Sequence, residues 1–126
     1  MHLIKTIPLP NALEIEIWDA SRPIAAYTVR IELVIKISVE VKREYFENPE
    51  QYEMTRKAFG SDALFEYRKE RSFVPLEMKQ AAFDELLSEF MRNSLEYLSK
   101  PNFPSRFILS KYRELQNIPT HFSGTE

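Results

Sequence analysis

The sequence predicts an α+β fold, an antiparallel sheet of three to four strands with a long helix packed on one face, in the chain order β-β-α-β-α-α. Three patterns predict this fold. Apolar and polar residues alternate over 27–41 and again over 64–74, which is the period of a strand with one buried face. Over 76–99 the apolar residues recur at helical spacing and form a broad stripe.

The strand predicted over 27–41 is unusually long. Its polar face contains a single apolar residue, Val34. Fifteen residues at about 3.3 Å each span roughly 50 Å, whereas a compact chain of this length has a diameter of roughly 36 Å. We therefore expect the strand either to curl or to extend past its own domain to a neighbour. Its apolar face consists of Tyr27, Val29, Ile31, Leu33, Ile35, Ile37, Val39 and Val41.

A shorter alternating segment, 13–18, predicts a strand before the long one. Residues 19–23, which follow it, include Asp19, Ser21 and Pro23 and are typical of a turn or short loop. Two strands so close in sequence most simply form an antiparallel hairpin. Residues 1–11 are read as an extended segment, which allows a short fourth strand near the N-terminus.

The segment 49–59 carries helix signals at both ends. Asn48 can cap the free amides, Pro49 suits the first turn, and Gln51 can reach back to an unpaired amide. Gly60 is placed to end the helix. We expect this helix to connect the second and third strands and to lie on the surface, because its apolar face is thin. That face contains Tyr52, Met54 and Phe59.

Two cations, Lys69 and Arg71, interrupt the apolar face of the third strand, 64–74, whose other members are Phe65, Tyr67 and Phe73. With apolar faces matched against the long strand, Lys69 lies near Ile37 and Arg71 near Ile35, on the side that the helix covers. Unpaired burial of a cation costs on the order of several kcal/mol. Three interpretations remain open: the cations protect an edge strand, they pair with acids of the long helix, or they mark an anion-binding pocket between sheet and helix. The stretch can equally extend past the core into solvent. The candidate acids are Asp84, Glu85 and Glu89.

The C-terminal third of the chain predicts two helices. Pro75 ends the third strand and opens the long helix, and Pro101 and Pro104 break it. A final short helix is expected over 105–115. We expect residues 1–116 to form a single α+β domain and 117–126 a frayed tail, because no linker or repeat divides the chain. The apolar stripe of the long helix comprises Phe83, Leu86, Leu87, Phe90, Met91, Leu95, Tyr97 and Leu98.

The composition limits the chemistry that the chain can carry. It contains no Cys, which excludes disulfides, thiol nucleophiles and thiolate metal sites. Two glycines, Gly60 and Gly124, are too few for a phosphate-binding loop or a dinucleotide fingerprint. Both histidines, His2 and His121, lie near the termini, where a rigid catalytic or metal-binding frame is rare. We therefore expect no catalytic residue, no metal site and no cofactor.

Acidic residues are frequent on the predicted strands, mostly on polar faces. A pair of carboxylates can perform acid–base chemistry or hold a divalent cation. Cross-strand ion pairs with Arg30, Lys36 and Arg68 require no special geometry, and we favour them. Ser21 has no nearby His to activate it, so nucleophilic catalysis is not expected.

Charge and hydropathy bear on the partners of the chain. A net charge of −2 provides no general attraction for nucleic acid or for an anionic membrane. Most aromatic residues occupy predicted core positions, with Trp18, Tyr45 and Tyr67 as the exceptions. No segment approaches the length of a transmembrane helix and the N-terminal segment has no signal-like apolar stretch, so a cytoplasmic location is expected.

These observations favour a non-catalytic interaction or assembly module that forms a homodimer, since a second copy can cover what a thin core leaves exposed. Any other protein partner is not indicated, and neither nucleic acid nor a membrane is expected. The alternative is a domain that binds a small anion or metabolite in the sheet–helix crevice near Lys69 and Arg71. An enzyme built on carboxylates is a more distant third hypothesis.

Overall fold

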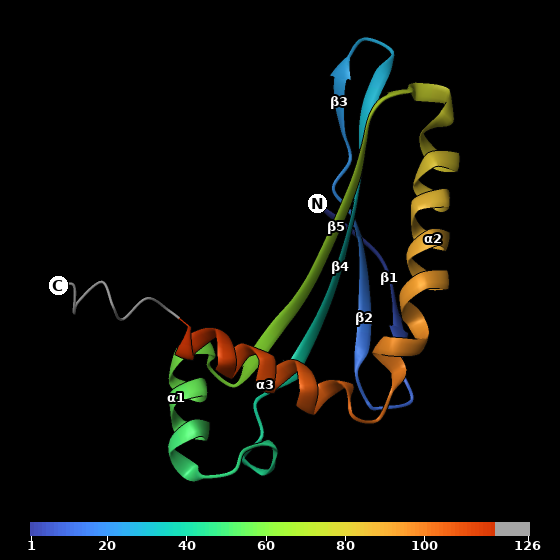
Figure 1. The fold of residues 1–126 in the computed structure, drawn as a ribbon. Coiled ribbons are helices and arrows are strands. Elements are labelled where there is room, and N and C mark those ends of the chain that lie inside the picture. The colour runs from blue at the N-terminus through green and yellow to red at the C-terminus, as the bar shows by residue number, and fades with distance from the viewer. Residues whose placement is uncertain (118–126) are drawn as a thin grey trace, which may run out of the picture. The chain divides into compact units, whose positions relative to one another are not determined.

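The computed structural model describes residues 1–117 and has the predicted α+β class, with a five-stranded antiparallel sheet and a long helix (Figure 1). Two short 3-10 turns, Arg43–Tyr45 and Leu76–Met78, flank the helical segments. Of the expected tail 117–126, all but the first residue lie outside the described part of the chain, as does His121. The elements are β1 (His2–Pro8), β2 (Glu14–Asp19), β3 (Arg22–Ala25), β4 (Thr28–Glu40), α1 (Pro49–Phe59), β5 (Asp62–Pro75), α2 (Lys79–Ser99) and α3 (Phe103–Gln116).

The chain divides into two compact units. The first contains 1–37 and 64–101, and the described part of the second contains 38–63 and 102–117. The chain passes from one unit to the other within β4, within β5 and after Pro101. That the two units belong to one domain stays a prediction.

In the first unit, β2 and β3 behave as one interrupted strand against β4. Trp18 lies opposite Val34 and Arg22 opposite Arg30, so the two strands continue a single antiparallel register along the same edge of β4. The predicted antiparallel pairing of these segments is confirmed, but the hairpin turn expected at 19–23 is not there, because residues 22 and 23 belong to β3. The interruption is a side-chain turn, in which Asp19 Oδ1 accepts the N–H of Ser21 at 2.8 Å.

The sheet has more strands than the sequence predicts. β1 pairs antiparallel with β2 and is the expected N-terminal strand. β3 was not expected, and it moves the hairpin turn to residues 26 and 27. Tyr27 therefore lies in the turn with 79% of its surface exposed, so its predicted place on the core face is wrong.

β5 pairs with β4, whose other edge β2 and β3 occupy. Arg68 reaches Glu32 and Glu70 reaches Arg30, which shifts β5 along β4 relative to the register that matched apolar faces suggested. At Tyr67 the face is as expected, because this ring packs against Phe90 of α2 with ring centroids 4.9 Å apart.

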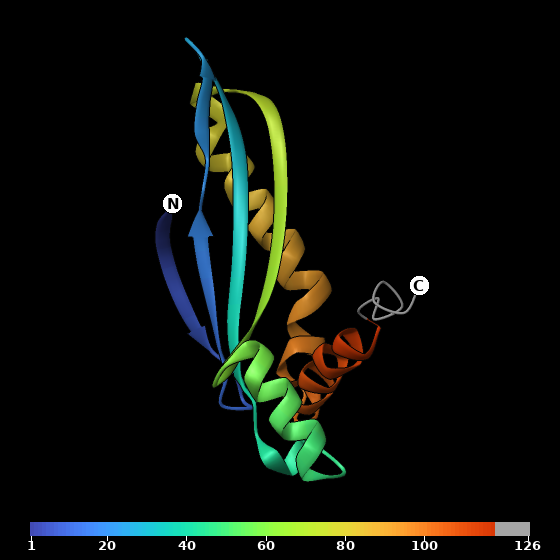
Figure 2. The same ribbon diagram turned by 90° about the vertical axis from the view of Figure 1, so that its left-hand side faces the viewer.

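The core of the first unit lies between the sheet and α2, which runs along one face of the sheet (Figures 1 and 2). Hydrogen bonds hold both ends of the helical segment that contains α2 and the 3-10 turn before it. At its start, the N–H of Leu76 donates to the carbonyl of Tyr27 at 2.8 Å. At its end, Asn11 Nδ2 donates to the carbonyl of Leu98 at 2.8 Å. The side chains that close this core include Ile15, Ile17, Ile31, Leu33, Ile35, Phe83, Leu86 and Phe90.

In the second unit, α1 packs against α3. Asn48 caps α1 by accepting the N–H of Gln51 at 3.0 Å, and Gly60 ends it with φ of 80°, as predicted. Thr55 is the buried residue of α1, so most of this helix lies on the surface. Pro104 sits in the first turn of α3 and does not precede the helix, because that turn has no need of its missing N–H.

Candidate functional sites

Lys69 and Arg71 lie in different environments. Arg71 is half-buried and forms an ion pair with Glu85 of α2, one of the three interpretations that the sequence left open. Lys69 is exposed and has no partner among the described residues. In the described part of the chain β5 pairs with β4 only, so Lys69 fits the interpretation of a cation that protects an edge strand. Neither cation is buried without a partner.

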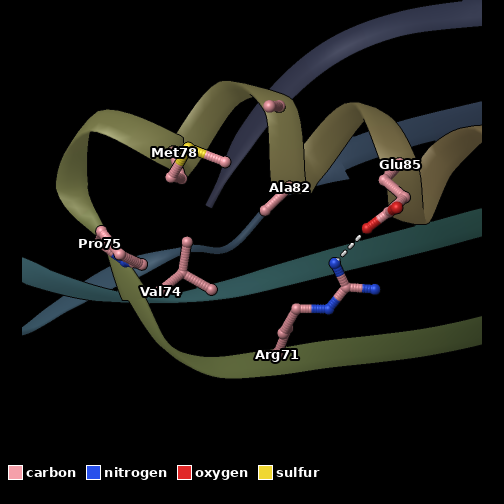
Figure 3. A pocket seen from close by; sticks show the side chains of 7 residues that line it. Arg71, Val74, Pro75, Met78, Ala82 and Glu85 are labelled. Atoms are coloured by element: carbon pink, nitrogen blue, oxygen red, sulfur yellow. Dashed lines mark hydrogen bonds and ion pairs between the residues drawn. The ribbon is translucent and has the colours of Figure 1, made fainter.

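A cavity of about 290 Å³ opens between the end of β5 and the beginning of α2 (Figure 3). Its walls are mostly apolar, and the Arg71–Glu85 ion pair closes one side. Because the two charges neutralise each other, the cavity carries no net charge at its wall. Lys69 does not border it. The lining residues are Arg71, Val74, Pro75, Met78, Ala81, Ala82 and Glu85.

The backbone of Phe73 creates this cavity wall. Phe73 has φ of 59°, a left-handed conformation that non-glycine residues rarely adopt and that costs about 1–3 kcal/mol. This conformation breaks the alternation of β5, so that Val74 turns inward to line the cavity and Phe73 turns outward with 74% exposed. The sequence placed Phe73 on the same face as Arg71, and that expectation is wrong.

Five large apolar side chains gather at the same end of the first unit, and we refer to them as the apolar tip. Ile24 and Tyr27 come from the β3–β4 hairpin, while Phe73, Leu76 and Met78 come from the junction of β5 and α2. The hydrogen bond between Leu76 and Tyr27 joins the two groups. This cluster is not apparent from the sequence, because the alternation pattern reveals neither the shifted register of β5 nor the inverted backbone at Phe73.

The sheet face opposite α2 carries cross-strand ion pairs. Arg68 contacts both Glu32 and Glu66, at 2.9 and 2.7 Å, and Arg30 contacts Glu70. The hydrogen bond from Arg30 lowers the pKa of the Glu70 carboxyl, and burial opposes this only partly. The ion pairs predicted for Arg30 and Arg68 are thus confirmed, and they hold the carboxylates of Glu32, Glu66 and Glu70.

Lys36 makes a different contact from the one predicted. Its Nζ lies 5.4 Å from the centroid of the Trp18 ring, which is within the range of a cation–π interaction. Trp18 Nε1 also donates to Glu16 at 2.9 Å. Opposite Trp18, Val34 is fully buried, so the polar face of the sheet has a small apolar centre of its own.

The other two aromatic residues singled out by sequence are also engaged. Tyr67 packs on Phe90, and Tyr45 is half-buried in the second unit, where burial raises the pKa of its hydroxyl. A ring held by neighbours offers less surface for stacking a base.

The second unit contains a cavity of about 290 Å³ near the start of α1. Its polar groups are already used locally, since Asn48 caps the helix and Gln51 Oε1 accepts the N–H of Glu47 at 3.3 Å. Tyr112 contributes a ring that also packs against Phe46. Glu50 is the charged residue of its lining, and no cation stands beside it among the five lining residues.

Within residues 1–117, no three His, Asp or Glu side chains come together in a way that could hold a metal ion. In the same residues, no helix has the length and apolar character needed to cross a membrane. Comparisons of this chain with protein families, curated proteins and solved structures find no match.

Proposed function

We propose that this chain is a non-catalytic assembly module that forms a homodimer through the apolar tip. The observation that carries the proposal is the exposure of five large apolar side chains at one end of the first unit, including Tyr27 at 79% and Phe73 at 74%. Exposed apolar clusters of this kind mark interaction surfaces, and aromatic residues dominate the binding energy of such surfaces. A cytoplasmic location is part of the same proposal.

The apolar area is sufficient for a specific contact between two copies. A fully exposed aromatic side chain presents about 150–250 Å², so Tyr27 and Phe73 together expose roughly 300 Å² at their observed fractions. Ile24, Leu76 and Met78 are smaller side chains, each 42–50% exposed, and they add roughly 200 Å². Complete burial of this surface in both copies would cover roughly 1,000 Å², which is the minimum expected of a specific interface.

The free strand edges are less suitable for assembly than the tip. β4 is paired along both edges. β5 carries Lys69 and Arg71 on the face that α2 covers, and β1 has a register irregularity beside Lys5, which lies opposite Ile17 on the core side. Inward cations and irregular pairing are devices that prevent strand addition at an edge.

Light scattering after size-exclusion chromatography tests the dimer. The wild type is expected to have twice the chain mass of 14.9 kDa at micromolar concentrations. A double variant, Tyr27→Ser with Phe73→Asn, is expected to be monomeric, because it removes the two most exposed rings while asparagine tolerates the left-handed backbone. Leu64→Ser, a change at an exposed apolar residue of β5 outside the tip, is the matched control and should remain dimeric. A monomeric wild type contradicts the proposal.

The second candidate function is binding of a small anion or metabolite near Lys69 and Arg71. The position of Arg71 at the cavity wall supports it. The ion pair with Glu85 opposes it, because an incoming anion must displace that carboxylate from the guanidinium.

A thermal-shift measurement with phosphate, sulfate and a short dicarboxylate separates the two candidates. Anion binding predicts a saturable rise in the melting temperature of the wild type by mass action, and its loss when Lys69 and Arg71 are both replaced by Gln. The assembly proposal predicts no such rise. A stabilisation that depends on both residues would decide for the anion.

A further inference from the structure

We infer that the cavity beside α2 is a socket for the Phe73 side chain of a second copy, so that each chain in the dimer both inserts a ring and receives one. This inference rests on the proposed homodimer and specifies the contact that holds it together. The juxtaposition that carries it is an outward aromatic ring directly next to an open apolar cavity on the same chain.

The socket has the size and the chemistry that a phenyl ring requires. Apolar cavities of about 150 Å³ already accommodate benzene-sized molecules, and this cavity has a volume of about 290 Å³. Val74, Met78 and Ala82 supply apolar walls, and Figure 3 shows their side chains around the opening. The guanidinium of Arg71 at the rim can lie against the face of a ring. Since Glu85 already neutralises that guanidinium, an uncharged ring fits the site better than an anion.

The inserting ring is held in an unfavourable exposed state in the single chain. Phe73 adopts a backbone conformation that most side chains avoid, and the consequence is that a large aromatic ring points away from its own core. Strained conformations of this kind persist only where the surrounding structure holds them, and they cluster at functional sites. Burial of the ring in a partner's socket supplies the contact that a single chain lacks.

The closeness of ring and socket favours a closed dimer over a filament. Phe73 immediately precedes Val74, a residue of the socket wall, so both features belong to one surface patch. A patch that contains both complementary halves can pair with itself about a twofold axis, which forms two identical contacts and leaves none open. Met78 belongs to both the apolar tip and the socket, so the same contact covers both surfaces.

Complementation between two defective variants tests this contact. Phe73→Asn removes the ring but keeps the socket. Ala82→Leu fills the socket but keeps the ring. Sedimentation equilibrium of each variant alone is expected to show a dimer dissociation constant raised about tenfold or more. In a mixture, the socket of Phe73→Asn receives the ring of Ala82→Leu, so a heterodimer retains one of the two contacts and should form in preference to either homodimer.

The outcomes separate this inference from the dimer proposal. A monomeric wild type overturns both. If the wild type is dimeric and Ala82→Leu dimerises equally well, the socket inference is wrong but the dimer proposal stands. The same conclusion follows if the two variants show no preference for forming a heterodimer. Ala81→Leu is a second variant that fills the same socket, and it changes an exposed helix position. It replaces Ala82→Leu if a leucine at the buried Ala82 prevents folding. Melting curves of each variant confirm that the folded chain is being compared.

Discussion

Replacement of Ile35 by aspartate is expected to prevent the first unit from folding. Ile35 lies on β4 with none of its surface exposed, opposite the equally buried Ile17. An unpaired carboxylate at this position loses its hydration without gaining a partner, a cost comparable with the whole stability of a small protein, about 5–15 kcal/mol. Far-ultraviolet circular dichroism and the dispersion of amide signals in an NMR spectrum would reveal the loss of the sheet.

The matched control is the neighbouring residue, because it faces the other side of the sheet. Lys36→Asp loses the cation–π contact with Trp18 and places a second carboxylate opposite Glu16. Together these changes should lower the free energy of unfolding by about 1 kcal/mol. The variant should therefore fold, with a slightly lower denaturation midpoint. Normal folding of Ile35→Asp would contradict the assignment of the buried face.

The sequence predicts the elements of this fold whose residues alternate or repeat over a long stretch. Within the first unit, β4, β5 and α2 each present an apolar face to the core, so burial and local periodicity favour the same structure. The ends of α1 are also predicted from the sequence. The Asn48 side chain accepts a free backbone N–H at the start of the helix, and Gly60 adopts a positive φ at its end. Such features need no information from distant parts of the chain.

The features that the sequence does not reveal depend on contacts between distant segments. Val34 sits on a polar face but is buried, because the paired β2 brings Trp18 opposite it. Tyr27 continues the alternation of β4, yet the added strand β3 places it in a turn. The register of β5 follows the ion pairs of Arg68 and Glu70 with β4, and a pattern of period two permits every even shift equally.

The candidate sites show the same limit. The sequence identifies Lys69 and Arg71 as unusual on an apolar face, and it names Glu85 among three possible acids. It cannot select Glu85, since that choice depends on the register of β5 and on where α2 starts. The left-handed backbone at Phe73 has no signal in the sequence, because no glycine marks that position. Both the cavity and the apolar tip depend on this conformation.

Truncation of Phe103 to alanine is expected to destabilise the second unit strongly. Phe103 is 1% exposed at the start of α3, and its ring stacks on Phe107 with centroids 5.8 Å apart. Removal of a buried aromatic ring leaves a cavity and typically costs about 3–5 kcal/mol. Urea denaturation measures the loss. Arg106→Ala, at an exposed position of the same helix, should change stability by no more than about 0.5 kcal/mol.

The same variant tests whether residues 1–116 form one cooperative domain. Trp18, the single tryptophan of the chain, lies in the first unit, whereas Phe103 lies in the second. In a single domain, unfolding is all-or-none, so Phe103→Ala must lower the urea midpoint of Trp18 fluorescence and of circular dichroism together. A Trp18 transition that stays at its wild-type midpoint, while circular dichroism shows an earlier loss of helix, would mean that the two units unfold independently.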